Sequence, residues 1–213
     1  MVLRYFNSGD FTKWQQSYRR NFFNSVGGFK SLNLIGTRSA RGAANLGLFF
    51  SVTHLGSTPP LVGVVFRSQN VPRHTLENIY DTGYFTINSV QKNYIEEAHQ
   101  ASAKYPESMS EFHEVGLRES YHANFLAPYV ESSRVKMGLK FVEKHDILAN
   151  GTTLVVGEVV ECWIDGDALN PDGFVDHTEI GNVAVNGLDT YYSATEIKKM
   201  PYARTKDDVK KSS

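Results

Sequence analysis

The chain has 213 residues, a formal net charge of −1 and 41% hydrophobic residues, so it is long enough to bury a sizeable core in one or two domains. The balanced charge argues against nucleic acid as the main partner, because proteins that bind the phosphate backbone carry a strongly basic face. The single cysteine, Cys162, excludes an internal disulfide and argues against a cysteine-based zinc site, and its apolar strand context predicts a buried, inert thiol.

The first predicted element is a helix in which Phe11, Trp14, Tyr18 and Phe22 recur at spacings of three and four, ending at Gly27-Gly28. Residues 1–28 are therefore expected to form an N-terminal helical extension. This region has no apolar run of signal-peptide length, and no stretch of the chain approaches the ~18 consecutive apolar residues of a membrane-spanning helix. We expect a cytoplasmic protein without a membrane partner.

Strand-like segments dominate the rest of the chain. They cover residues 31–38, 44–52, 60–66, 83–90, 134–148 and 152–165, the last two joined by an Asn150-Gly151 turn. Two short helices are expected among them, one from near Pro72 to Gly83 and one over 93–105. Residues 106–133 are predicted to form a loop, long enough to suggest a functional role.

Six strands with few helices, several joined by hairpin-like turns, indicate a mainly β protein built on an antiparallel barrel. The expected domain covers residues 29–200, followed by a charged, flexible tail at 201–213. A six-stranded barrel is too narrow to hold a cofactor, since even ~8 strands leave room for little more than side chains. Any ligand is therefore expected on the outside, against strand ends, loops or a second subunit.

Positive charge gathers where the strand at 60–66 ends and the next helix begins. If that helix begins near Pro72, the backbone N–H groups of residues 73–75 point outward at its positive end and form an anion site. The side chains that add charge or hydroxyl groups there are Arg67, Ser68, Arg73, His74 and Thr75. A phosphate site and an ordinary capped helix with a solvated arginine explain these residues about equally well.

The strand before it has an unusual polar side. Alternation along a strand places Asn45, Gly47, Phe49, Ser51 and Thr53 on one face. An amide, a glycine without a side chain and two hydroxyls are unusual in a core and suit the wall of a binding site for a polar planar ligand. The glycine would allow such a ligand to approach the backbone. A solvent-facing strand side is the alternative.

The order of these motifs resembles the flavin reductase-like family. The resemblance rests on the strand closing in Ser51-x-Thr53, the Pro59-Pro60 entry to the next strand, the H-T-x-x-N-I helix at 74–79 and the T-G-x-F-x-I-N strand at 82–88. The segment GTTLVVGEVVE further on resembles the family's late strand, and the match covers most of residues 29–195. It implies a six-stranded split barrel with Greek-key character that binds FMN at a homodimer interface.

The resemblance also implies roles for individual residues. The isoalloxazine ring and ribityl chain would be lined by Asn45, Leu46, Ser51 and Thr53. The phosphate would be held by Arg67, Ser68, Arg73, His74 and Thr75, with Arg38 and Ser39 closing the other side. Two positions depart from the pattern, because Met137-Gly138 stands where relatives often carry a cysteine, and Arg73-His74 where some carry a lysine–aspartate pair.

The implied activity is that of an NAD(P)H-dependent flavin reductase, in which hydride passes to N5 of the flavin and electrons continue to a second flavin, oxygen or a partner such as an oxygenase. No obligatory catalytic side chain is expected, and the candidates His54 and His122 are more typical of structural hydrogen-bonding histidines. No metal site is expected, because three polar residues in the run 111–114 on a loop do not define ligand geometry. Two alternatives stay open: an FMN-bound electron carrier, similar to flavoredoxin, without its own NAD(P)H site, and a non-enzymatic module for another ligand, such as haem or pyridoxal phosphate.

Overall fold

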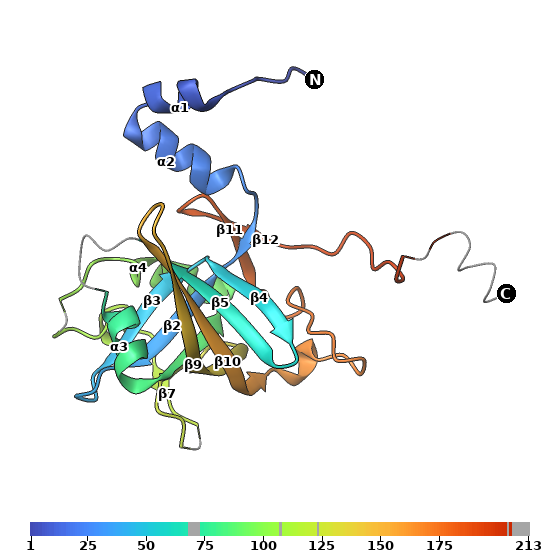
Figure 1. Ribbon diagram of the computed structural model, residues 1–213. Helices are drawn as coiled ribbons and strands as arrows, with labels where there is room; N and C mark the ends of the chain where they lie inside the picture. The colour runs from blue at the N-terminus through green and yellow to red at the C-terminus, as the bar shows by residue number, and fades with distance from the viewer. Residues whose placement is uncertain (68–72, 107, 123, 204, 206–213) are drawn as a thin grey trace.

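A computed structural model describes residues 1–67, 73–106, 108–122, 124–203 and 205. Its centre is a seven-stranded sheet in which every neighbouring pair is antiparallel, in the order β3-β2-β6-β9-β10-β5-β4 (Figure 1). The strands are β2 (Asn33–Arg38), β3 (Ala44–Phe49), β4 (Val52–Ser57), β5 (Pro60–Phe66), β6 (Tyr84–Ser89), β9 (Val135–Ile147) and β10 (Thr152–Ile164). The predicted mainly β, antiparallel class is confirmed.

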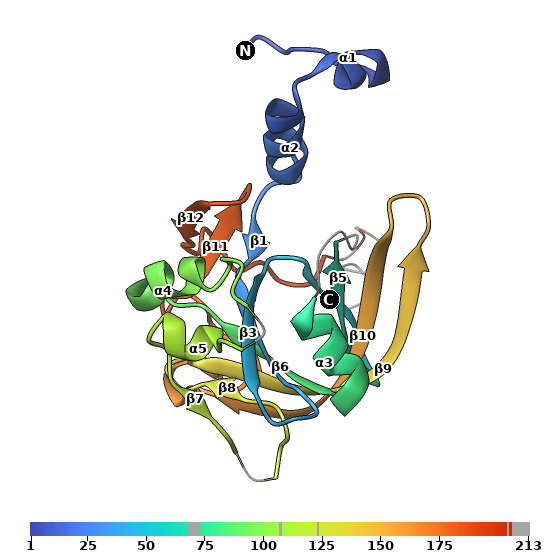
Figure 2. The same ribbon diagram turned by 90° about the vertical axis from the view of Figure 1, so that its left-hand side faces the viewer.

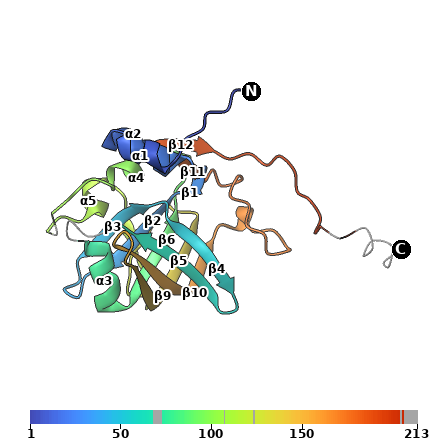
Figure 3. The same ribbon diagram turned by 45° about the horizontal axis from the view of Figure 1, so that its top comes forward.

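The sheet closes on itself because its two edge strands are one continuous run of chain. β3 pairs only with β2 and β4 only with β5, yet just two residues, Phe50 and Ser51, separate them. The Val65 N–H donates to the Ser51 carbonyl at 3.1 Å and extends the β4–β5 pairing into this bend. The strand predicted at 44–52 thus ends at Phe49, and β4, which was not predicted, makes the observed number of strands seven where six were expected. Figure 3 shows β3 and β4 on different sides of the barrel.

A helix connects the two halves of this barrel. Four of the barrel strands, β2 to β5, precede α3 (His74–Thr82) in the chain, and the other three, β6, β9 and β10, follow it. The helix therefore connects β5 to β6, which are not neighbours in the sheet. The helix ends at Gly83, whose φ of 74° lies in the left-handed region that a glycine adopts without strain. The predicted stop at this glycine is confirmed.

The interior of the barrel is filled with apolar side chains. Phe66, Phe85, Leu139 and Val155 are at most 1% exposed and pack with residues of every barrel strand. Leu76 and Ile79 of α3 belong to the same cluster and close one end of it. The barrel therefore leaves no interior space for a ligand, and a binding site has to lie on its outer surface.

A second apolar cluster lies on the outer side of β2 and β3. It unites Leu34 and Leu46 with Tyr94 and Phe112, which come from the segment between β6 and β9. That segment holds α4 (Ile95–Gln100), α5 (Glu111–Glu114), β7 (Glu119–Ser120) and β8 (Tyr129–Val130). The prediction that residues 106–133 are loop is therefore only partly right, because the segment packs as a layer against the barrel.

One buried acidic side chain links this layer to β3. Glu111 of α5 is 8% exposed and accepts a hydrogen bond from the Leu46 backbone N–H at 3.0 Å. Replacing Glu111 with alanine leaves that N–H buried without this partner, so we expect a loss of about 1–3 kcal/mol in the free energy of unfolding. Denaturant unfolding measures this loss. Glu114→Ala on the exposed side of the same helix is the control, and an equal effect of both variants would contradict the prediction.

The outer regions of the fold consist of smaller elements. A three-stranded sheet has the order β1-β11-β12, formed by β1 (Lys30–Ser31), β11 (Val183–Asn186) and β12 (Thr190–Ser193). The short 3₁₀ helices are η1 (Lys92–Tyr94) and η2 (Gly166–Ala168). Sequence reasoning missed β11, which pairs with the nearby β12 and with the distant β1. Among the described residues, no helix has the length and apolar character needed to cross a membrane.

Two helices stand away from the barrel at the N-terminal end, α1 (Ser8–Lys13) and α2 (Gln16–Ser25) (Figure 2). The predicted helical pattern at 11–22 is thus divided near Trp14. Rings of the two helices contact one another, with Trp14 lying 5.0 Å from Phe11 and 4.9 Å from Phe22 between ring centroids. Neither helix contains a buried residue, so the two helices are held together mainly by these contacts between half-buried rings.

Candidate functional site

The first residues at the N-terminus of α3, Arg73, His74 and Thr75, are half-buried. The helix begins at His74, and its N-cap residue is Arg73, whose side chain makes no capping hydrogen bond. Arginine is not a helix-capping residue, so the N–H groups of the first turn lack the acceptor that serine or aspartate would supply, while the backbone N–H of Arg73 itself donates to the Glu77 carboxylate at 3.3 Å. The helix was expected to begin near Pro72, which lies outside the described residues. An uncapped helix N-terminus of this kind attracts anions.

Two arginines bring positive charge to this end of the helix. Arg67 directly follows the last residue of β5, and its charge, together with the larger effect of partial burial, lowers the pKa of Arg73 below the usual value of arginine. The two guanidinium groups are therefore close enough to repel each other. Such repulsion is relieved when a phosphate or another anion binds between them.

The polar side of β3 contacts the first turn of α3. The Asn45 side-chain amide donates hydrogen bonds to the hydroxyl oxygens of Thr37 at 3.1 Å and Thr75 at 3.0 Å. A Cβ atom at Gly47 would lie 3.2 Å from the same Thr75 oxygen, which explains why the strand has no side chain at this position. Asn45, Gly47 and Thr75, predicted as ligands of the same cofactor, are thus brought together although they come from two distant segments.

A small pocket of about 270 Å³ lies beside this contact. Its wall combines the turn after β2, the start of β3, α3 and the segment just before α5. The lining residues are Ser39, Arg41, Ala43, Ala44, Asn45, His74, Glu77, Asn78, Ser108 and Met109. Three of them, Ser39, Asn45 and His74, were predicted from the sequence. Sequence reasoning missed Arg41 and Asn78, because only the packing of α3 against the turn brings them to the pocket.

The predicted polar face of residues 45–53 ends at Phe49. Both Phe49 and Val52 pack against the interior cluster of the barrel, so the bend at Phe50 and Ser51 shifts the alternation of side chains by one residue. Thr53 is exposed on β4, and the Ser51 hydroxyl donates to the Val65 carbonyl at 2.7 Å. The prediction of one continuous face is wrong, because alternation holds only while a strand stays straight.

Three further residues that were predicted to contact the cofactor make other contacts in the structure. The Leu46 side chain is fully buried in the second apolar cluster. Arg38 is exposed, donates to the Gly42 carbonyl at 3.1 Å and lies 5.7 Å from the Tyr121 ring centre, while the Ser39 hydroxyl oxygen accepts from the Ala43 N–H at 3.0 Å. Ser68 lies outside the described residues.

Comparison with known proteins identifies the family of this chain. Residues 30–180 match the model of the flavin reductase like domain. The crystal structure of a candidate flavin reductase with a split barrel domain from Shewanella frigidimarina NCIMB 400 is 44% identical, with a TM-score of 0.91 over 94% of this chain and 100% of that one. The chain belongs to the flavin reductase-like family.

Two more distant structures share the fold of this flavin reductase-like protein. Nitrilotriacetate monooxygenase component B from Bacillus cereus is 13% identical, with a TM-score of 0.83 over 94% of this chain and 100% of that one. The flavoredoxin of Desulfovibrio vulgaris (Miyazaki F) is 24% identical, with a TM-score of 0.70 over 82% of this chain and 92% of that one. At these identities the likeness concerns the fold alone.

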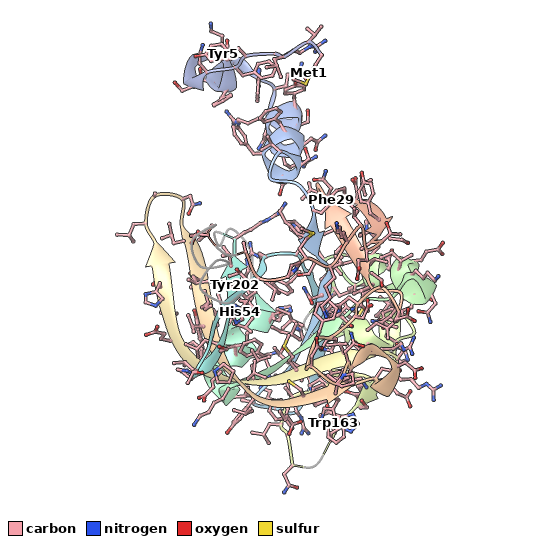
Figure 4. All side chains as sticks on the ribbon, turned by 90° about the vertical axis from the view of Figure 1, so that its right-hand side faces the viewer. Met1, Tyr5, Phe29, His54, Trp163 and Tyr202 are labelled. Atoms are coloured by element: carbon pink, nitrogen blue, oxygen red, sulfur yellow. The ribbon has the colours of Figure 1, made fainter. Side chains whose placement is uncertain are left out.

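The two candidate histidines of this flavin reductase-like chain lie apart. His54 is exposed on β4, whereas His122 stacks on Trp163 of β10 with 4.3 Å between ring centroids. Figure 4 shows Trp163 at the end of the molecule opposite the N-terminal helices, well away from His54. The His122 Nε2 atom is buried and makes no hydrogen bond within the described part of the chain. These two histidines do not form one catalytic group.

The segment at 111–114 does not bring its polar residues together. Glu111 points inward to Leu46, whereas His113 and Glu114 are exposed. Within the described ranges, no group of three or more His, Cys, Asp or Glu side chains is arranged to hold a metal ion.

The only cysteine lies on the surface of β10, so the prediction of a buried thiol is wrong. Cys162 lies opposite Met137 of β9, close to the C-terminal end of β10. Partial burial of the sulfur atom and the nearby carboxylate of Glu161 raise the pKa of Cys162. The thiol is therefore accessible but is not activated as a thiolate.

Proposed function

We propose that this protein is an NAD(P)H:flavin oxidoreductase that binds FMN on the outside of the barrel, with the phosphate at the N-terminus of α3. The observation that carries the proposal is the first turn of α3, where Asn45 of β3 donates to the Thr75 hydroxyl oxygen at 3.0 Å beside the N-cap residue Arg73 and near Arg67. In a chain of the flavin reductase-like family, this is a fitting place for the phosphate that distinguishes FMN from riboflavin.

The residues around the helix N-terminus fit the cofactor. Arg67 and Arg73 would neutralise the phosphate, and Thr75 would donate its hydroxyl proton to a phosphate oxygen, because that hydroxyl is an acceptor in its bond with Asn45. His74 and Ser39 would complete the polar wall, and Gly47 leaves the room that the Thr75 hydroxyl and the Phe49 ring occupy. Ser51, Thr53, Leu46, Arg38 and Ser68 remain proposed contacts.

The protein's own part in the reaction is to bind and orient. FMN, when bound, would supply the redox chemistry with a nicotinamide as donor, so no side chain would have to act as an acid or base. The hydrogen-bonded pair Asn45–Thr75 fixes the first turn of α3 against β3 and so keeps the anion site in one geometry. We propose no catalytic role for His54 or His122.

We further propose that the protein acts as a cytoplasmic homodimer with the flavin between subunits. The support for this is physical: the barrel interior is packed, and a flavin on an open outer wall needs further protein to exclude water from its rings. The domain would cover residues 29–200. The shared fold with nitrilotriacetate monooxygenase component B makes an oxygenase a reasonable recipient of the reduced flavin.

An absorbance spectrum of the purified protein tests the activity. We expect flavin bands, either retained or restored by added FMN, that bleach at once when NADH or NADPH is added without oxygen. Bands that persist with both donors would instead indicate an electron carrier that receives electrons from another protein. Absence of flavin bands even after FMN addition would contradict the proposal and favour a module for another ligand. The donor that bleaches faster defines the preference.

A further inference from the structure

The N-terminal extension contacts the proposed phosphate site through one side chain. Asn24, in the last turn of α2, accepts a hydrogen bond on its Oδ1 atom from the Arg67 guanidinium at 3.1 Å. The other end of the same amide donates to the Arg20 carbonyl at 2.7 Å, which fixes the orientation of the oxygen toward Arg67. The contact joins two residues that are 43 positions apart in the sequence.

The same arginine rests on an aromatic ring. The Arg67 guanidinium carbon lies 5.4 Å from the centre of the Phe50 ring, and the Lys30 ammonium lies 5.3 Å from the same centre. The Lys30 ammonium in turn donates to the Asn24 backbone carbonyl at 2.7 Å. Asn24, Lys30, Phe50 and Arg67 therefore form one connected cluster, and we call it the Asn24 cluster.

The partners of Arg67 in the Asn24 cluster hold the guanidinium without cancelling its charge. An amide oxygen and a ring face are electrically neutral, and within the described ranges no carboxylate forms an ion pair with Arg67. A carboxylate in the place of Asn24 would hold the arginine equally well but would compete with an incoming phosphate. Because these partners are neutral, the full positive charge of Arg67 is available to bind an anion.

We propose that Asn24 is a positioning residue for flavin phosphate, so that the N-terminal extension is part of the cofactor site. This inference rests on the proposed function, because it assumes that Arg67 binds the phosphate of FMN. It assigns to residues outside the barrel a role in distinguishing FMN from riboflavin, which lacks the phosphate. It also explains why α2, which has no buried residue, ends in contact with the barrel at this arginine.

Asn24→Asp tests the proposal, since it changes the amide to a carboxylate of nearly the same shape. We expect the Kd for FMN, measured by flavin fluorescence with the full chain, to rise by about ten-fold or more, because the new charge pairs with Arg67. The Kd for riboflavin should stay unchanged. Asn21→Asp is the matched control, because it adds the same charge on an exposed position of the same helix and should leave both constants unchanged.

The outcomes separate this inference from the proposed function. If Asn24→Asp binds FMN like Asn21→Asp, or loses FMN and riboflavin affinity in parallel, Asn24 does not serve the phosphate and the inference is overturned while FMN binding stands. If the unaltered protein binds riboflavin as tightly as FMN, the phosphate site itself is wrong and the inference is overturned with it.

Discussion

Replacing Arg73 with alanine should weaken FMN binding by ~1.5–3 kcal/mol, which corresponds to a roughly 10- to 150-fold increase in Kd. The guanidinium at the N-cap of α3 supplies one of the two charges at the proposed phosphate site. Its removal also ends the repulsion from Arg67, so the measured loss is the net of a lost contact and a relieved one. Titration of the Arg73→Ala variant and of the unaltered protein with FMN, followed by flavin fluorescence, gives the two Kd values to compare.

Arg118 offers the control for this variant. It is an exposed arginine that pairs with Glu131 at 3.1 Å, distant in sequence from the proposed site. Arg118→Ala should bind FMN like the unaltered protein. The phosphate assignment fails if Arg73→Ala keeps its FMN affinity, or if Arg118→Ala loses as much.

Replacing Gly36 with alanine should lower the free energy of unfolding by about 3 kcal/mol. A Cβ atom at this position of β2 would overlap the Pro128 carbonyl oxygen and lie 2.7 Å from the Thr86 hydroxyl oxygen. These two groups are hydrogen-bonded to each other at 2.6 Å, so neither can move without breaking that bond. Denaturant unfolding with circular dichroism detection measures the change.

Gly166→Ala is the matched control, because no atom lies within 4 Å of a Cβ atom built there and its backbone is not in the left-handed region. This variant should unfold within about 0.5 kcal/mol of the parent chain. Equal stability of Gly36→Ala and Gly166→Ala would show that β2 tolerates a side chain between β6 and the segment before β8.

Much of the barrel could be predicted because its strands carry local signals. The β-branched runs at 60–66 and 152–165 and the turn at Asn150-Gly151 are signals that lie within a few residues of sequence. The strands and the hairpin that they predict are confirmed by β5, β9 and β10. The bend at Phe50 and Ser51 could not be predicted, because it exists only where one run of chain pairs with two different partners. The strand β11 was also missed; it forms a local hairpin with β12, and its other partner, β1, lies far away in the sequence.

The same distinction between local signals and long-range contacts applies to the candidate site. The charges and hydroxyls at 67–75 are adjacent in sequence, so their chemistry could be read directly. The contact between Asn45 and Thr75 spans 30 positions, and the one between Asn24 and Arg67 spans 43, so folding was needed to show them. Arg41 gave no signal beyond being a basic residue in a turn, and only the packing of α3 against that turn makes it part of a pocket.

The bend between β3 and β4 also restricts how this chain can change during evolution. Because two residues, Phe50 and Ser51, carry the chain from one edge of the sheet to the other, deleting either of them would turn every side chain of β4 to the opposite surface. An insertion of the same size would do likewise, whereas the loops outside the barrel can gain or lose residues at little cost. Homologous sequences are therefore expected to diversify by gaps on either side of the run 44–57 and by substitutions alone within it.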